Sequence, residues 1–325
     1  EGEKLQLVGT PLETVSDGSG DYTIHAPVGT YNLRVTAPGY SPVVIEDVEV
    51  SHGGVVVEDV ALEVSRKIAV VASNSPRSQI IGILEEEGYE AQGFTDNAAG
   101  ATELLEVIDE FALIFVNDLL TSVTDATLDE IIEKARVNDI SMIFTSQWGG
   151  SPISRLSNTY GDPAEVNWGA QPQYLSYKVV KEHPIFAGFE VGDVIRILDN
   201  GTLNQQYSVF SGYSGETIAE VMGSAETVIG DGLAFRYPSA NSVHLLLGSL
   251  RVGSYAPPAT RWAEDTRQIF INSIDWAISA SLGEISGLVT DADGDPIPNA
   301  TVAIESEGIA TGTNAEGRYR IGIGL

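Results

Sequence analysis

The centre of the chain contains three side chains that could together hydrolyse an ester or an amide. Ser146 lies at the end of the apolar run "SMIFTS", and a nucleophilic serine there would need a general base within hydrogen-bond reach. His183 and His244 are the histidines of this part of the chain and are therefore the candidate bases. Backbone amides around Gly149 and Gly150 would be placed to stabilise an oxyanion. One interpretation of this part of the chain is therefore a serine hydrolase.

The same residues also support a non-catalytic interpretation. The stretch around Ser146 reads "TSQWGG", which differs from the G-x-S-x-G turn that exposes a nucleophilic serine. His183 precedes Pro184 in a predicted turn, and His244 has apolar neighbours within a predicted strand. We therefore expect a degenerate pocket without enzymatic activity, and we keep hydrolysis by Ser146 as the alternative.

A second group of polar side chains, near the C-terminus, could bind calcium. The stretch "DADGD" places the carboxylates of Asp291, Asp293 and Asp295 at every second position next to a glycine, and Ca²⁺ prefers such oxygen ligands. A complete EF-hand loop would have a glutamate at its twelfth position, where this chain has Val302. The alternative is a hairpin turn rich in Asp and Gly, and "SDGSGD" is open to the same two interpretations. We expect no required cofactor, with calcium as the one candidate.

Aromatic residues form a third group that has two interpretations. Trp148 and Trp168 lie in or near glycine-containing stretches, where exposed rings could stack on a sugar. Trp276 lies two turns after Ile269 on one stripe of a predicted helix, so we expect it to pack in the core.

The composition of the chain excludes several classes of partner. The chain has 325 residues, of which 46 are acidic and 17 basic, and its formal net charge is −29. Phosphate backbones and anionic lipids repel such a surface, so we expect no nucleic-acid binding. An apolar run of about 18 residues is absent, which predicts no membrane span. The lack of Cys excludes disulfides, thiolate nucleophiles and zinc sites built on Cys.

The hydrophobic patterns divide the chain into three regions. Residues 1–64 follow the strand period in "DYTIHAP", "TYNLRVTAPGY" and "VVVEDVALEV", which predicts a small antiparallel β-sandwich. Residues 66–282 alternate short apolar strands, such as "KIAVVAS" and "FALIFVND", with helices such as "TDATLDEIIEKARVND", whose "TDAT" is an N-cap sequence. This alternation predicts right-handed βαβ units and a parallel sheet. The strand period returns in residues 283–325 and predicts a second sandwich.

One nine-residue pattern occurs in both outer regions. "SDGSGDYTI" at residues 16–24 and "TNAEGRYRI" at residues 313–321 share a glycine, a tyrosine and an isoleucine at the same spacing. Together with "PVGTYNLRVTAPGY" and "NATVAI", they resemble the carboxypeptidase-regulatory-like family, whose transthyretin-like sandwiches occur beside catalytic domains in secreted proteins. The first copy matches the later part of the family pattern and the second copy its earlier part. We therefore expect the chain to be a piece of a longer protein.

Four motifs of the middle region, "KIAVVAS", "HPIFAGF", "VHLLLGSL" and "FINSIDWAIS", occur in an order that resembles the class I glutamine-amidotransferase-like fold. Within that fold they are most similar to the trehalose-utilisation-like branch. The resemblance implies a flavodoxin-like α/β sheet. The amidotransferase nucleophile is a cysteine, which this chain lacks, and branch members often have a histidine where this chain has Ser249. The resemblance therefore supports the fold and not the amidotransferase chemistry.

The combined prediction is a multidomain chain: a flavodoxin-like α/β domain at 66–282 between partial Ig/transthyretin-like sandwiches at 1–64 and 283–325. The resemblances imply a non-catalytic accessory, spacer or adhesion region of a larger extracellular or cell-surface protein, such as a secreted subtilisin-like serine protease. The alternatives are a repeat unit of an extracellular filament or tandem surface array, and the Ser146 hydrolase. The expected partners are neighbouring domains of the same polypeptide, or further copies that pair through sandwich edge strands.

Overall fold

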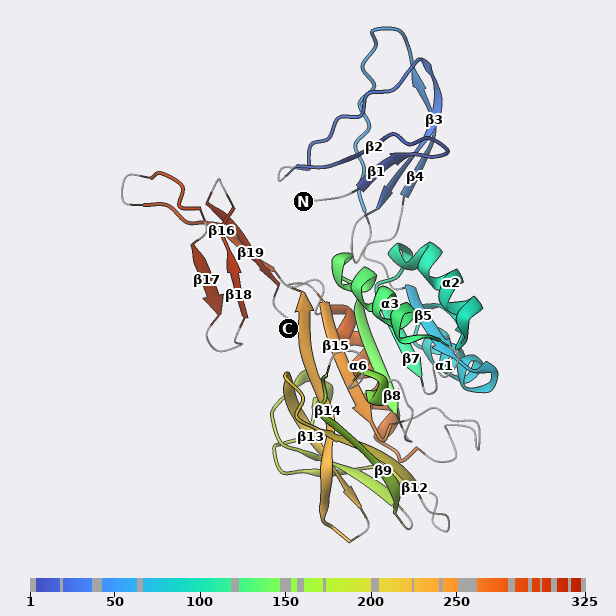
Figure 1. Cartoon of the computed structure of the whole chain (residues 1–325), viewed down its shortest axis with the longest axis vertical. Helices are drawn as coiled ribbons and strands as arrows, with labels where there is room; N and C mark the ends of the chain where they lie inside the picture. The colour runs from blue at the N-terminus through green and yellow to red at the C-terminus, as the bar shows by residue number, and fades with distance from the viewer. Residues whose placement is uncertain are drawn as a thin grey trace.

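The chain forms an N-terminal β region at one end of its long axis, a larger α/β region at the other end, and a small C-terminal β region at its side (Figure 1). Within the described residues, no helix is long and apolar enough to cross a membrane. The computed structural model describes residues 4–17, 20–36, 43–62, 67–117, 123–146, 153–156, 161–171, 174–199, 205–223, 225–239, 242–250, 262–279, 284–291, 294–298, 300–304, 309–314 and 317–322.

The N-terminal region contains a four-stranded antiparallel sheet, which confirms the all-β prediction. The strand order is β2-β1-β3-β4. Side chains from alternate strand positions form its small core, which contains Leu5, Leu7, Leu33, Val35 and Val48. The segments Asp21–Pro27 and Val55–Leu62 differ from the prediction, because neither is part of a strand. The strands are β1 (Lys4–Leu7), β2 (Glu13–Val15), β3 (Gly29–Thr36) and β4 (Val43–Val50).

The α/β region is built on five parallel strands. Their spatial order, β6-β5-β7-β8-β15, corresponds to 2-1-3-4-5 along the chain, which is the flavodoxin-like order. Nearly all residues of β5, β7 and β15 are buried, as expected for strands that are covered on both faces. The strands are β5 (Lys67–Ala72), β6 (Glu90–Thr95), β7 (Leu113–Asn117), β8 (Ser141–Ser146) and β15 (Ser242–Gly248).

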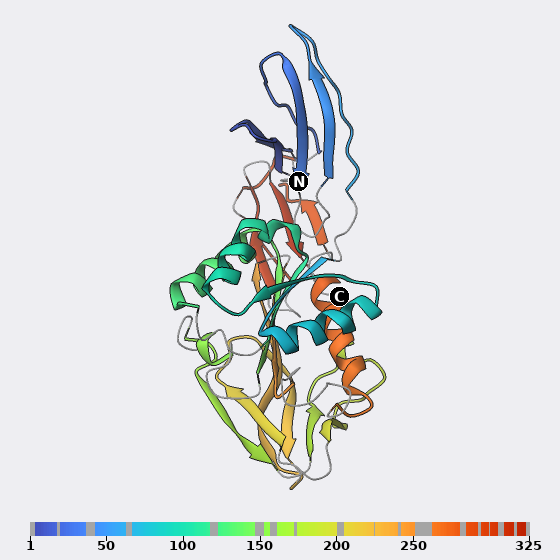
Figure 2. The ribbon, with the colours of Figure 1, turned by 90° about the vertical axis from the view of Figure 1, so that its right-hand side faces the viewer.

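Helices cover both faces of this sheet (Figure 2). α1 (Asn74–Glu86) and α6 (Thr266–Ser279) pack into one hydrophobic cluster, and α2 (Ala98–Val107) and α3 (Asp125–Val137) pack into another on the opposite face. The predicted N-cap of α3 is confirmed, because Thr124 Oγ1 accepts a hydrogen bond from a backbone N–H of the first turn.

An antiparallel half extends the same sheet beyond β15, so the predicted parallel arrangement describes only part of it. The connections between β13 and β14 and between β14 and β15 are short, and parallel pairing would need long crossovers. A further pair, β9 with β12, joins this half through β14. The strands are β14 (Val228–Ser239), β13 (Glu216–Gly223), β10 (Tyr174–Val179), β11 (Val194–Asp199), β9 (Glu165–Gln171) and β12 (Gln205–Ser211).

The C-terminal region contains two two-stranded antiparallel sheets. β16 (Glu284–Leu288) pairs with β19 (Arg318–Gly322), and β17 (Thr301–Ile304) pairs with β18 (Ile309–Gly312). None of the described side chains of this region belongs to a buried hydrophobic cluster of the chain. Isolated two-stranded sheets are marginally stable, so this region is weakly held together by its own packing.

Glu110, at the end of the short helix η1 (Ile108–Glu110), connects the N-terminal and α/β regions. Its carboxylate lies 3.5 Å from the Arg34 guanidinium of β3 and 2.8 Å from Lys67 Nζ of β5. The Lys67 ammonium also lies 4.9 Å from the centroid of the Phe111 ring. All three charged side chains are partly shielded from solvent, so these contacts help to orient one region on the other.

Candidate functional site

Polar side chains gather where the parallel strands β7, β8 and β15 end. This edge is where ligands bind in α/β sheets of flavodoxin-like order. Asn117 at the end of β7 is the register partner of Thr145 in β8, and Ser146 at the end of β8 is the partner of Gly248 in β15. The three strand ends therefore bring these residues side by side.

Asn117 and Thr145 hydrogen-bond to each other at this edge. Thr145 Oγ1 donates to Asn117 Oδ1 at 2.8 Å, and both residues are at most 1% exposed. A buried pair of this kind satisfies polar groups that would otherwise destabilise the fold. Because the Thr145 hydroxyl is already used as a donor, the pair stabilises the edge and does not expose a reactive group.

Ser249, directly after β15, is also held by internal hydrogen bonds. Its φ is +66°, a left-handed conformation that is uncommon for a residue other than glycine and that often occurs at functional sites. The Ser249 hydroxyl donates to Ser208 O at 2.8 Å and accepts from Ser208 N at 3.1 Å. These bonds attach the end of β15 to β12 and explain how the buried serine is kept in this conformation.

The backbone of β15 is closely packed at Gly248. The Tyr177 hydroxyl donates to Gly248 O at 2.6 Å, and burial raises the pKa of Tyr177 far above its usual value. A Cβ atom at position 248 would lie 2.8 Å from Ser208 O and 2.9 Å from Gly232 O. Only glycine fits here, and the surroundings of the strand end are filled by protein atoms.

Ser146 and His244 lie at different levels of the sheet. His244 is the register partner of Met142, whereas Ser146 is the partner of Gly248, four residues further along β15. At about 3.3 Å per residue, this offset is roughly 13 Å along the strands. A general base must lie within about 3 Å of the proton that it removes. The structure therefore does not bring His244 to Ser146, whose side chain lies, with Gly149 and Gly150, outside the described residues.

The His244 ring is enclosed by apolar groups. The residue is 2% exposed, and its ring meets the Phe144 ring edge to face at a centroid distance of 5.7 Å. Among the described residues, neither ring nitrogen has a hydrogen-bond partner. Burial lowers the pKa of His244 to about 3, and the positive charge of Arg236 contributes to the decrease. The ring is therefore neutral at neutral pH and is a poor proton acceptor.

His183 lies in a turn, as its position before Pro184 suggests. Its Nδ1 accepts a hydrogen bond from Ile185 N at 3.3 Å and caps the short helix η2 (Pro184–Phe186). The ring lies 5.0 Å from Phe235 and 4.5 Å from Trp276, by centroids, and burial lowers the pKa of His183 to about 4. Since Phe235 is on β14, two strands from β8, His183 and Ser146 are not brought together either.

The stretch "DADGD" forms a tight turn that uses one of the predicted calcium ligands. Asp291 Oδ1 accepts from Asp295 N at 2.9 Å, and Gly294, with a φ of +91°, donates to Asp291 O at 3.2 Å. Asp293 lies outside the described residues, and the described part of the chain contains no group of three side chains that could hold a metal ion. Calcium binding by Asp291, Asp293 and Asp295 stays a prediction.

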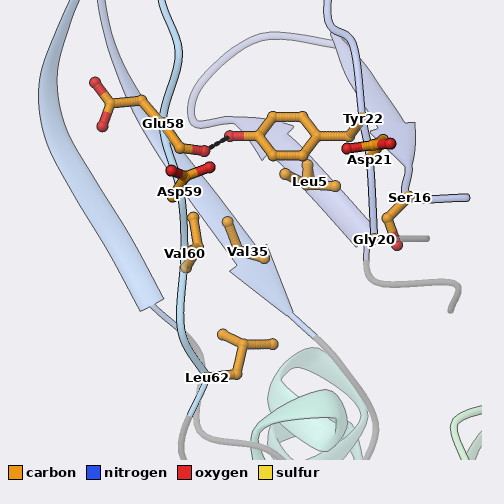
Figure 3. A pocket seen from close by; sticks show the side chains of 10 residues that line it. All are labelled: Leu5, Ser16, Gly20, Asp21, Tyr22, Val35, Glu58, Asp59, Val60 and Leu62. Atoms are coloured by element: carbon orange, nitrogen blue, oxygen red, sulfur yellow. Dashed lines mark hydrogen bonds between the residues drawn. The ribbon is translucent and has the colours of Figure 1, made fainter.

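A groove in the N-terminal region is a feature that the sequence patterns did not single out (Figure 3). It has a volume of about 460 Å³ and lies between the segments that contain Tyr22 and Glu58. The Tyr22 hydroxyl donates to Glu58 O at 2.7 Å, and burial, together with the charges of Glu58 and Asp59, raises the pKa of Tyr22. The sequence of both segments has the period of a strand, but periodicity within a segment does not show whether a neighbouring strand pairs with it.

Asn117 and Thr145 were also not singled out by the sequence patterns. Each follows a continuous run of buried apolar residues, and a polar residue at the end of such a run is a signal that could have found them. For the aromatic residues, Trp276 is buried as predicted, and Trp168 on β9 is 59% exposed.

Comparisons with known proteins agree with part of these predictions. Residues 2–63 match the carboxypeptidase regulatory-like domain, which confirms the resemblance of the N-terminal region. No curated protein matches the chain.

Two solved structures have a partial likeness to this chain. A putative GMP synthase protein from Thermoplasma acidophilum is 14% identical, with a TM-score of 0.43, and the match covers 66% of this chain and 94% of that chain. A glutamine amidotransferase from Thermotoga maritima is 10% identical, with a TM-score of 0.38, and the match covers 56% of this chain and 74% of that chain. At these values no activity of either protein is transferred to this chain.

Proposed function

We propose that this chain is a non-catalytic accessory region that acts as a spacer or adhesion segment of a larger secreted or cell-surface protein. The match of residues 2–63 to the carboxypeptidase regulatory-like domain supports an accessory role. The net charge of −29 and the absence of Cys are compatible with an extracellular location. A subtilisin-like protease as the parent protein is proposed from the family resemblance alone.

The observation that carries this proposal is the position of the two histidines. His244 is level with Met142 rather than with Ser146. His183 caps a turn, and its ring packs against Phe235 of β14, which is two strands from β8. A serine nucleophile without a base remains largely unreactive. The polar groups that do lie at the strand ends, Asn117, Thr145 and Ser249, hydrogen-bond within the protein.

A spacer must also hold its parts at a defined angle, and Glu110 supports this role. Its carboxylate contacts Arg34 in the N-terminal sheet and Lys67 in the central sheet at the same time. Charge pairs that are partly shielded and shared in this way restrict the relative motion of two regions more than a single exposed pair does.

An activity screen of the whole chain tests the proposal. Ester, amide and glycoside substrates are offered to the parent chain and to the variants Ser146→Ala, His183→Gln and His244→Gln, with circular dichroism as the control for folding. We expect no turnover above background in any of them. Turnover by the parent chain that Ser146→Ala abolishes would establish the hydrolase alternative and overturn the proposal.

A second candidate function is a repeat unit of an extracellular filament or tandem array. The specific observation in its favour is that the β17–β18 pair repeats the register of the β1–β2 pair. Lys4 pairs with Val15 and Thr301 with Gly312, an offset of 301 − 4 = 297 and 312 − 15 = 297 residues. Light scattering and electron microscopy with and without added calcium test this candidate. Ordered assemblies would support it, and a monomer under both conditions would count against it.

A further inference from the structure

β9 is an edge strand of the antiparallel half of the large sheet. All seven of its residues pair with β12, which is its one partner among the described strands. The other side of β9 forms no backbone hydrogen bond with any residue that the structure describes. An open edge of this length is a template on which another strand can pair.

The hydrogen bonds of Ser208 show which backbone groups of β9 point outward. Ser208 of β12 lies opposite Trp168 of β9. Ser208 N donates to the Ser249 hydroxyl at 3.1 Å, and Ser208 O accepts from that hydroxyl at 2.8 Å. Opposite residues of an antiparallel pair exchange either both backbone bonds or none, so the N–H and C=O of Trp168 point away from β12. By the period of two, the same groups of Val166 and Ala170 also point outward.

The strands at the two ends of the large sheet, β11 and β6, carry features that hinder pairing. On β11, Leu198 forms a bridge with Trp262, and Arg196 adds an exposed charge. On β6, a Cβ atom at position 93 would lie 2.7 Å from Arg77 Cδ, so this cationic side chain lies against Gly93. Charged side chains and covering segments are common ways in which proteins protect an edge strand.

β9 lacks these protective features. Its first residue, Glu165, carries its one charge, and residues 166–171, VNWGAQ, contain neither a charged residue nor a proline. The register of β9 on β12 is continuous and has no bulge. Trp168 lies at the centre of β9 and is 59% exposed. Exposed tryptophans with this much accessible ring surface are typical of protein interfaces.

We propose that β9 pairs antiparallel with β9 of a second copy of this chain, about a two-fold axis at Trp168, and that the chain is a homodimer. In this register Trp168 lies opposite Trp168 of the second copy, and Val166 lies opposite Ala170. These are the residues whose backbone groups point outward, so each pair exchanges both of its hydrogen bonds. Their side chains share one face, where aromatic and aliphatic groups meet across the two strands.

The charges of the chain favour this partner and this direction. The net charge of −29 makes two copies repel each other over most of their surface, whereas β9 carries one charge at one end. In the antiparallel pair, Glu165 lies opposite Gln171 of the second copy. The two Glu165 residues are then 171 − 165 = 6 residues apart along the strands, roughly 20 Å, which exceeds the Debye length of about 8 Å. Parallel pairing would place them side by side.

The position of β9 is compatible with the proposed spacer role. Figure 1 shows β9 and β12 in the part of the α/β region that is remote from the N-terminal strands β1 to β4. Pairing through β9 therefore leaves the N-terminal region of each copy accessible to other domains. The dimer does not depend on whether the chain has an enzymatic activity, so it goes beyond the proposed function.

Analytical ultracentrifugation of the whole chain tests the dimer. One strand pair is a small interface, so we expect a reversible equilibrium between monomer and dimer in the micromolar range. Raising the salt concentration from about 0.05 to 0.5 M should strengthen the dimer, because salt screens the repulsion between two acidic chains. A chain that is still monomeric at about 0.5 mM in the higher salt would overturn the proposal.

A pair of variants at Ala170 tests the position of the interface. Ala170 is exposed, and its N–H points away from β12. Ala170→Pro therefore removes an outward donor and no bond to β12, whereas Ala170→Ser keeps the donor. We expect the first variant to weaken the dimer by about tenfold or more and the second to leave it unchanged, with equal circular dichroism spectra. Unchanged association of Ala170→Pro would place the contact on another surface and contradict the proposal.

The tryptophan pair is tested with a matched control on another edge strand. Trp168→Ala should weaken the dimer by about tenfold or more, because central aromatic residues contribute most to the stability of interfaces. Val194 on β11 is 55% exposed, close to the exposure of Trp168, and Val194→Ala should leave the dimer unchanged. Equal dissociation constants for the two variants would show that Trp168 lies outside the interface and would overturn the two-fold pairing.

Discussion

The carboxyl edge of the central sheet and the groove of the N-terminal region differ in how their polar groups are satisfied. At the edge, Thr145 hydrogen-bonds to Asn117 and Ser249 to the backbone of β12. Beside the groove, the backbone groups of Tyr22–Ala26 form no ladder with any described residue. Satisfied polar groups stabilise a fold, whereas an unpaired strand edge can bind another strand. The two regions therefore differ in packing, because internal hydrogen bonds close the strand ends, whereas the groove is open.

The largest expected effect comes from placing the same substitution in both regions. Gly248→Ala should lower the free energy of unfolding by about 3 kcal/mol, because the new Cβ meets two backbone oxygens. Gly20→Ala should lower it by only about 1 kcal/mol, because its positive φ is strained but its surroundings are open. Urea denaturation measures both. Gly82→Ala in α1, with no neighbour within 4 Å of its Cβ, is a control that should not destabilise. Equal losses at positions 248 and 20 would remove the contrast in packing.

A second prediction concerns the contribution of His244 to the pH dependence of the free energy of unfolding. Its pKa is lowered from 6.5 to about 3 in the folded chain. As the pH falls below 6.5, the unfolded state takes up a proton and the folded state does not, so stability decreases down to about pH 3. At pH 5 the decrease amounts to about 2 kcal/mol. His244→Leu should be free of this part of the decrease.

Urea denaturation at pH 7 and pH 5 measures the difference between the parent chain and His244→Leu. The exposed His52 provides the matched control, and His52→Gln should follow the parent chain at both pH values. If His244→Leu lost as much stability as the parent chain between these pH values, the His244 ring would be in contact with water in the folded chain.

The smallest expected effect concerns the contacts that Glu110 forms between the N-terminal region and the α/β region. Glu110→Ala removes the contacts to Arg34 and Lys67 and should lower the free energy of unfolding by about 0.5 to 1 kcal/mol. Small-angle X-ray scattering should then show a broader distribution of distances. Glu13→Ala, which removes an exposed pair with Lys4 within one sheet, should leave the scattering unchanged. Identical curves for both variants would mean that Glu110 does not orient the regions.

Much of the fold could be predicted because local patterns determine it. The continuous apolar runs of β5 and β7, the N-cap Thr124 and the repeated Gly–Tyr–Ile spacing each depend on residues that are close in sequence. The antiparallel half was harder to predict from the sequence, because strand direction depends on which strands become neighbours. The prediction of a parallel sheet therefore did not hold for this half.

The candidate site could be predicted only in part, because its geometry depends on register. Ser146 and His244 are 244 − 146 = 98 residues apart, and nothing local states that Met142 rather than Ser146 lies beside His244. The groove was missed for a related reason. The pattern of Tyr22–Ala26 indicates a strand, and a pattern on one segment cannot reveal that its partner is missing from the described sheet.

Hydrogen exchange tests the difference between the two regions most directly. The amides of Tyr22–Ala26 should exchange rapidly, while those of Leu245 and Leu246 in β15 remain protected. Exchange in Tyr22–Ala26 that is as slow as exchange in β15 would contradict the account.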